Sequence, residues 1–253
     1  MNVTTVFILG PAGSGKTTLV ASFGKYLEDQ GLRVCYVNLD AAVEDLPYTP
    51  DFDIRTYYTV DDIMKKERVG PNMALIKSVE YLLNYRDNIT SFLKNVPELY
   101  DYVLVDTPGQ LELTIFHDSS IQIMKLFTEI GRACGVFLLP SDIIRNVRDL
   151  AFLKLMALAV RYRLDVPIVT AISKADINPN VDKIIELDIE SPEFLDKVEI
   201  EGVQQDLVRE MWRIIKKLEK RQRIIKVSSL TGQGLEDLHS LIYEVFCTCG
   251  DLT

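Results

Sequence analysis

The chain has 253 residues, 47% of them hydrophobic, and its 28 basic and 37 acidic side chains give a formal net charge of −9. This length allows a large domain with a buried core, and the acidic excess argues against nonspecific nucleic-acid binding, which needs a basic surface. No apolar run approaches the roughly 20 residues of a membrane helix, and the N-terminus reads as a core strand rather than a leader. We therefore expect a cytoplasmic protein without membrane contact.

Short runs of β-branched and apolar residues alternate with helical patterns along the chain. Near-continuous apolar runs, such as V-F-L-L at 136–139, are typical of parallel strands that are covered on both faces. The alternation predicts a doubly wound α/β fold with a mostly parallel sheet. The predicted strands lie at 4–9, 33–39, 102–106, 135–139, 168–172 and 224–227.

Helical patterns fill most of the segments between these strands. Two stretches, 41–99 and 177–221, are longer than the alternating core requires, and we interpret them as helical insertions in one domain that spans residues 1–253. The acidic part at 177–202 is either a solvated surface excursion or a lid or partner surface. The predicted core helices lie at 16–30, 117–131, 142–163, 203–221 and 235–247.

Residues 10–17 read G-P-A-G-S-G-K-T between the first strand and the first helix, which is the pattern of a phosphate-binding loop. Glycines let the backbone N–H groups turn toward an anion, and the helix directs its positive end at the same place. A lysine and a hydroxyl at the end of the motif can reach the terminal phosphates and Mg²⁺. The residues predicted to bind a nucleoside triphosphate here are Gly13, Ser14, Gly15, Lys16, Thr17 and Thr18, with Thr17 as a metal ligand.

The string D-T-P-G-Q at 106–110 follows the strand predicted at 102–106. Asp106 at the strand end can hold Mg²⁺, Gly109 can offer its N–H to a γ-phosphate, and Gln110 can orient an attacking water. The alternatives are an ordinary turn and a solvent-exposed glutamine. Asp40 ends the second predicted strand and can join the metal shell or position the water, or it can serve as a turn or helix cap.

The string S-K-A-D at 173–176 follows another predicted strand. The Asp176 carboxylate can accept hydrogen bonds from guanine N1–H and the 2-amino group, a pattern that adenine lacks. Lys174 can lay its stem along the base plane. The usual first residue of this motif is Asn or Thr, and Ser173 stands there instead. A weaker signal at Ser229 and Leu230 predicts a backbone N–H that contacts the base.

In this order the motifs resemble the GPN-loop GTPases over essentially the whole chain. The specific element is the triplet Gly70-Pro71-Asn72 between N-L-D at 38–40 and D-T-P-G-Q, and we expect a short rigid turn there. Ala41 replaces the proline that often follows N-L-D in the family. The resemblance implies a homodimer in which residues 70–72 enter the partner's site and Asn72 approaches the γ-phosphate.

The same resemblance associates Asp40 and Gln110 with the attacking water, places Glu112 in the same switch stretch, and links eukaryotic members to RNA polymerase assembly and nuclear import. We therefore predict Mg²⁺-dependent hydrolysis of GTP to GDP and phosphate by a nucleotide-driven switch or assembly factor. Lys16, Asp40, Asn72 and Gln110 are its predicted catalytic residues. The alternatives are a P-loop kinase that transfers a phosphoryl group and a nucleotide-gated scaffold with slow hydrolysis.

Overall fold

The computed structural model describes residues 3–178, 180–186, 203–218 and 224–246. Contacts within the chain group it into two compact units, residues 1–136 and 137–253. The seven strands and the helices between them confirm the predicted doubly wound α/β fold. The prediction of a single domain with two insertions stays a prediction.

The first unit contains strands in the order β3-β2-β4-β1, and beside β1 the first residues of β5, which runs across the boundary between the units. The pairs β1–β4, β2–β3 and β2–β4 are all parallel, and their registers set Asp106 at the end of β4 opposite Ile8 on one side and Asn38 on the other. This alignment brings the ends of three strands to one edge, where parallel α/β sheets bind ligands. The strands are β1 (Thr4–Leu9), β2 (Val34–Asn38), β3 (Phe52–Asp53), β4 (Tyr102–Asp106) and β5 (Arg132–Pro140).

Helix α1 (Lys16–Asp29) packs on this sheet because its apolar residues recur every three or four positions. Leu19, Phe23 and Leu27 on that face are fully buried or nearly so. Gly24 lies on the same face, where an added Cβ would stand only 2.3 Å from the Tyr36 ring. The close approach of α1 to β2 therefore depends on a glycine at this position.

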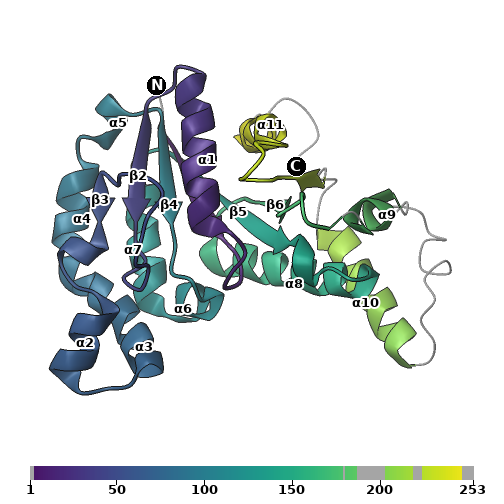
Figure 1. Ribbon diagram of the computed structural model, residues 1–253, viewed down its shortest axis with the longest axis horizontal. Helices are drawn as coiled ribbons and strands as arrows, with labels where there is room; N and C mark the ends of the chain where they lie inside the picture. The colour runs from purple at the N-terminus through teal and green to yellow at the C-terminus, as the bar shows by residue number, and fades with distance from the viewer. Residues whose placement is uncertain (1–2, 179, 187–202, 219–223, 247–253) are drawn as a thin grey trace. The chain divides into compact units, whose positions relative to one another are not determined.

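The segment 41–99 is largely helical, as predicted. Figure 1 shows α2 and α3 as a pair at the end of this unit where β2 and β4 finish. The short strand β3 was not predicted, since two residues are too few for a periodic pattern. The remaining helices of the unit are α2 (Val60–Glu67), α3 (Pro71–Tyr81), α4 (Arg86–Leu93), α5 (Val96–Leu99), α6 (Leu111–Phe116) and α7 (Asp118–Thr128), with 3₁₀ turns η1 (Ile54–Thr56) and η2 (Leu82–Tyr85).

In the second unit, β6 pairs with β7 in parallel. The helix predicted at 142–163 begins later, because residues 141–143 form a 3₁₀ turn and the Asn146 side chain caps the helix at Val147. Most of the acidic stretch 177–202 lies outside the described residues. The elements are η3 (Ser141–Ile143), α8 (Val147–Leu164), β6 (Ile168–Ser173), α9 (Asn180–Glu186), α10 (Val203–Leu218), β7 (Ile225–Lys226) and α11 (Leu235–Phe246).

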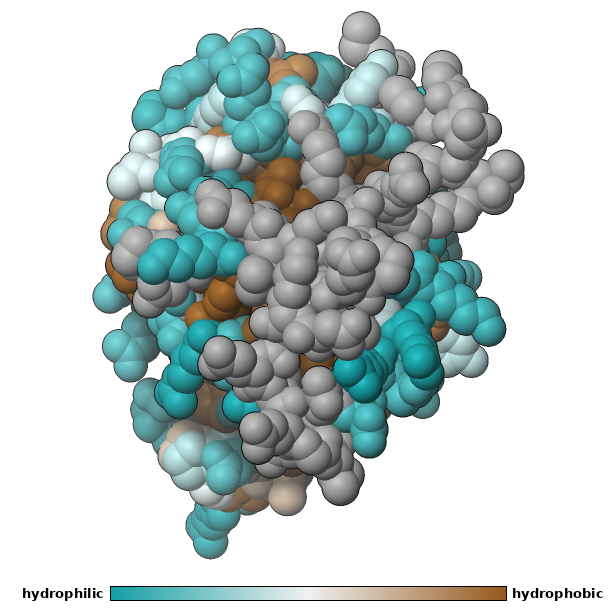
Figure 2. Space-filling model, turned by 90° about the vertical axis from the view of Figure 1, so that its right-hand side faces the viewer, coloured by the Kyte–Doolittle hydropathy of each residue, from teal (hydrophilic) through white to brown (hydrophobic). Residues whose placement is uncertain are grey.

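The coloured part of the face in Figure 2 is mostly hydrophilic, and hydrophobic residues show as smaller areas between polar ones. Among the described residues, no helix is both long and apolar enough to cross a membrane.

Candidate active site

The phosphate loop joins β1 to α1 and is shaped by its glycines. Gly13 and Gly15 have φ values of 72° and 91°, a left-handed conformation that side chains with a Cβ rarely adopt. The loop leads the buried Lys16 back over its own backbone, where Nζ donates to the carbonyl oxygens of Gly10 at 2.9 Å and Pro11 at 3.1 Å. Phosphate oxygens are stronger acceptors for an ammonium group than these neutral carbonyls.

Lys16 also connects the loop to the end of β4. Its Nζ donates to the Gly109 carbonyl oxygen at 2.8 Å. Burial lowers the pKa of Lys16, and the negative charges of Asp106, Asp40 and Glu112 act in the opposite direction. A cation with three acidic neighbours in the same unit is the arrangement expected where phosphates and a metal ion bind together.

Asp106 is the predicted metal ligand, and its surroundings fit that role. The residue is fully buried, and burial raises the pKa of its carboxyl group to about 6. Its Oδ2 accepts a hydrogen bond from the Tyr48 hydroxyl at 3.0 Å, whereas the buried Oδ1 has no partner among the described residues. Thr17 lies beside the same carboxylate and lowers its pKa. A carboxylate oxygen and a hydroxyl are the donors that Mg²⁺ prefers.

No group of three or more Asp, Glu, His or Cys that could hold a metal appears in the described part of the chain. A cation bound by Asp106 and Thr17 would therefore need further oxygen ligands from water and phosphate. That is the usual coordination of Mg²⁺ in nucleotide sites.

Asp40 lies beside the same strand ends and is held by backbone amides. Its Oδ2 accepts from the Gly109 N–H at 2.8 Å and its Oδ1 from the Ala42 N–H at 2.9 Å. Burial raises the pKa of Asp40, and these two hydrogen bonds act against that shift. The Gly109 N–H predicted to face a γ-phosphate thus donates to Asp40 here. Binding of a phosphate by this N–H would release one Asp40 oxygen, which could then accept a hydrogen bond from water.

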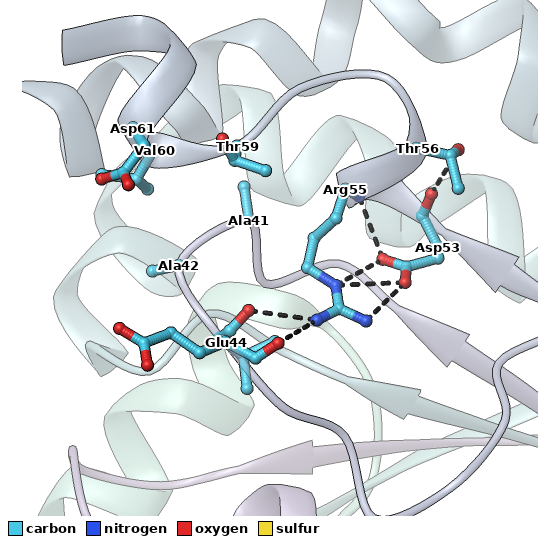
Figure 3. A pocket seen from close by; sticks show the side chains of 10 residues that line it. Ala41, Ala42, Glu44, Asp53, Arg55, Thr56, Thr59, Val60 and Asp61 are labelled. Carbon is cyan, nitrogen blue, oxygen red and sulfur yellow. Dashed lines mark hydrogen bonds and ion pairs between the residues drawn. The ribbon is translucent and has the colours of Figure 1, made fainter.

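A polar network that the sequence did not reveal fixes the loop after Asp40. Asn38 Nδ2 donates to Asp53 Oδ1 at 2.9 Å, and Asn38 Oδ1 accepts from the Asp40 N–H at 3.0 Å. The Arg55 guanidinium forms a 2.7 Å ion pair with Asp53 and donates to the carbonyl oxygens of Val43 and Glu44. Figure 3 shows Arg55 between these groups, with Ala41, Thr59, Val60 and Asp61 around a cavity of about 450 Å³.

The turn predicted at 70–72 is wrong in its local structure, because Pro71 and Asn72 form the first turn of α3. Gly70 is the N-cap, and its carbonyl oxygen accepts from the Ala74 N–H at 3.0 Å. Proline is favoured at the first helical position, since its missing N–H has no partner there in any case. Gly70, Pro71 and Asn72 are all exposed. The triplet is therefore presented at the surface of the first unit by a helix start.

Gln110 and Glu112 lie at the start of α6. Gln110 is the N-cap residue, is exposed, and forms no capping hydrogen bond through its side chain within the described residues. Glu112 is also exposed in the first turn of this helix. The Gln110 amide thus does not cap α6, which is compatible with the predicted contact to water.

The second unit brings the two predicted base-reading segments together at the ends of β6 and β7. The Ala175 N–H donates to the Val227 carbonyl oxygen at 3.1 Å, and the Lys174 carbonyl oxygen accepts from Ser141 Oγ at 2.6 Å. Lys174 has a left-handed φ of 57°, and its Nζ forms a 2.7 Å ion pair with Asp142.

The remaining predicted residues of this segment are accessible. Asp176 is exposed, Ser229 is half-buried, and Leu230 is exposed in the loop after β7. The structure thus groups Lys174, Asp176, Ser229 and Leu230 in the second unit, and groups the residues predicted to contact phosphate and metal in the first.

Comparison with known proteins assigns the family. Residues 8–248 match a family model described as a conserved hypothetical ATP binding protein. The chain is 35% identical over 251 residues to GPN-loop GTPase PAB0955 of Pyrococcus abyssi, covering 98% of this chain and 99% of that protein. The chain belongs to the GPN-loop GTPase family. This membership confirms the family resemblance predicted from the motifs.

Further members support the assignment. GPN-loop GTPase 3 of Dictyostelium discoideum is 34% identical over 235 residues, which cover 91% of this chain and 75% of that protein. The crystal structure of the apo form of the GTPase PAB0955 from Pyrococcus abyssi is similar to this chain, with a TM-score of 0.86 and 32% identity. The match covers 97% of this chain and 98% of that one. This GPN-loop family member therefore shares its fold with a solved GTPase.

Proposed function

We propose that this GPN-loop family member hydrolyses GTP to GDP and phosphate in a Mg²⁺-dependent reaction. The observation that carries the proposal is the convergence of the phosphate-loop Lys16 with Asp106, Asp40 and Gly109 at one edge of a parallel sheet. The relatives named above are GTPases, which favours hydrolysis over phosphoryl transfer to another acceptor.

Each residue has a task that follows from its position. Lys16 neutralises charge on the terminal phosphates, and the backbone of the phosphate loop binds them. Asp106 and Thr17 would hold Mg²⁺, which supplies further positive charge at the phosphates when it is bound. Asp40, once the Gly109 N–H turns to the γ-phosphate, can accept a hydrogen bond from the attacking water, and Gln110 can orient that water. Positioning and charge neutralisation account for catalysis of this kind.

The most direct experiment measures phosphate release from GTP and from ATP by the purified full chain, with Mg²⁺ and with EDTA. We expect release from GTP in Mg²⁺ and little from ATP. Lys16→Ala is the control for a contaminating hydrolase, because it should weaken nucleotide binding and turnover together. Phosphate release that persists in Lys16→Ala, or that does not need Mg²⁺, would contradict the proposal.

We further propose a homodimer in which each subunit lends residues 70–72 to its partner's site. The support is the exposure of Gly70, Pro71 and Asn72 at the start of α3, where an Asn72 amide can donate to a phosphate oxygen. A role as a nucleotide-driven switch or assembly factor, with clients such as RNA polymerase, rests on the family resemblance. The proposal of a cytoplasmic location rests on the phosphate-loop motif and the sequence pattern of the first residues.

Mixing of two inactive variants tests the shared site. Lys16→Ala and Asn72→Ala are prepared separately, and each homodimer should be nearly inactive. In a mixed dimer, the subunit with Asn72→Ala keeps its own Lys16 and receives Asn72 from its partner, so that activity returns. Subunit exchange is verified by ultracentrifugation. Exchange without recovered activity means that Asn72 does not act across the dimer.

A further inference from the structure

Tyr48 connects the loop after Asp40 to the predicted metal ligand. Its hydroxyl donates to Asp106 Oδ2 at 3.0 Å, although the two residues are 58 positions apart in the chain. Asp106 is fully buried, and its other oxygen, Oδ1, has no hydrogen-bond partner among the described residues. The Tyr48 phenol thus engages Oδ2 of this carboxylate, and the Thr17 side chain also interacts with the carboxyl group.

The Tyr48 ring is itself held in place. It stacks on Tyr36 of β2, with ring centroids 5.4 Å apart and an angle of 22° between the planes. The segment is anchored again three residues later, where Asp51 exchanges hydrogen bonds with the Tyr36 backbone, each 2.8 Å long. Tyr100 adds a 2.8 Å hydrogen bond from its hydroxyl to Asp51 Oδ1. A phenol fixed in this way provides a donor of defined position.

We propose that Tyr48 is a positioning residue for the metal site: its hydroxyl holds Oδ2 of Asp106 and so leaves Oδ1 available for Mg²⁺. Residues that orient a metal-binding side chain without touching the metal commonly determine metal affinity. The inference rests on the proposed function in one respect, namely that Asp106 binds Mg²⁺. It goes beyond that function in giving Tyr48, in the loop after Asp40, a part in metal binding.

The proposal also joins two features of the site. Asp40 accepts from the Gly109 N–H, and Tyr48 donates to Asp106, so that the segment 40–48 contacts the end of β4 and the loop after it at two points. Asp40 and Tyr48 therefore fix the two ends of this segment at the site.

Substitution of Tyr48→Phe tests this role, because it removes the hydroxyl and keeps the ring that stacks on Tyr36. The full chain is loaded with GDP in EDTA, and Mg²⁺ is titrated by calorimetry. We expect the Mg²⁺ dissociation constant to rise roughly 10- to 100-fold, the range usual for the loss of a group that orients a metal ligand. The affinity for GDP in EDTA should stay unchanged, since the phenol contacts the metal ligand and not the phosphate loop.

Tyr100→Phe is the matched control. It removes a phenol of the same unit that bonds a carboxylate of the same segment, but at Asp51 rather than at Asp106. If Tyr48 had a merely structural role, Tyr48→Phe and Tyr100→Phe would have the same Mg²⁺ affinity. Tyr48→Leu, which also loses the stacking, should weaken Mg²⁺ binding at least as much as Tyr48→Phe. Circular dichroism verifies that the variants are folded.

The outcomes separate this proposal from the proposed function. An unchanged or tighter Mg²⁺ affinity in Tyr48→Phe, beside a wild type that does bind Mg²⁺, overturns the role of Tyr48 alone. A wild-type GDP complex that shows no Mg²⁺ binding overturns the metal site, and the role of Tyr48 with it.

Discussion

Substitution of Asp106→Asn should raise the unfolding free energy at pH 8 relative to pH 4 when nucleotide and Mg²⁺ are removed, and it should abolish the metal site. The carboxyl group is fully buried, and burial raises its pKa from 3.8 to about 6. A folded-state pKa above the unfolded value means that the stability from protonation is present below pH 3.8 and is lost as the pH rises through 6. At pH 8 the ionised carboxylate therefore costs up to about 3 kcal/mol.

The neutral amide escapes this cost but carries an N–H₂ group, whose burial without an acceptor costs ~1–3 kcal/mol. The cost of burying the amide is the same at every pH, because the amide does not titrate. It therefore cancels when the stabilities at two pH values are compared. The difference in unfolding free energy between Asp106→Asn and wild type should be larger at pH 8 than at pH 4 by ~2 kcal/mol. Urea unfolding of the nucleotide-free protein, followed by circular dichroism, measures it.

Asp87→Asn serves as the control, because Asp87 is exposed on α4 of the same unit. Its loss should change the unfolding free energy by a few tenths of a kcal/mol at most, through the helix dipole. A difference between Asp106→Asn and wild type that is the same at both pH values would refute the reasoning, since the buried carboxylate would then not titrate as the structure indicates.

Three further predictions concern the same unit. Gln110→Ala should retain nucleotide binding and lower kcat, and single-turnover kinetics can separate the binding step from the chemical step. Turnover equal to that of wild type would show that Gln110 does not orient the water. Arg55→Lys should lower the unfolding free energy by ~1–2 kcal/mol in urea titrations, because lysine cannot bridge Asp53 and two carbonyl oxygens at once; an unchanged midpoint would contradict this. Lys16→Ala should raise the GTP dissociation constant in equilibrium titrations as well as lower kcat, and a change in kcat alone would be the contrary result.

The phosphate loop could be predicted from sequence because its chemistry depends on local backbone conformation. The glycines at 13 and 15 adopt the left-handed φ values that the motif requires, and Lys16 follows at a fixed spacing. Asp40, two residues after β2, and Asp106, the last residue of β4, were found for a similar reason, since apolar runs indicate where buried strands stop. Local pattern and tertiary position coincide at these residues.

Tyr48, Asp53 and Arg55 could not be found in this way. They lie in a segment whose regular structure is limited to a two-residue strand and a single 3₁₀ turn, so that no periodicity marks them. Their roles come from contacts over long sequence separations, such as the one between Tyr48 and Asp106. The start of α3 was predicted wrongly as a turn for another reason, because Gly-Pro-Asn is also a common turn sequence. Proline is favoured at the first position of a helix, and this preference was the signal that could have indicated a helix start.

The central claim is that this chain acts on guanine nucleotides, and the family description names ATP whereas the relatives are named GTPases. Hydrolysis of GTP, ATP and XTP by wild type and by Asp176→Asn decides between them. Wild type should prefer GTP, and Asp176→Asn should lose GTP affinity by roughly 30- to 150-fold, the equivalent of about 2–3 kcal/mol, and gain XTP, because its amide can donate to the 2-oxo group of xanthine. Equal use of GTP and ATP by wild type, or an unchanged ratio of GTP to XTP in the variant, would contradict the account.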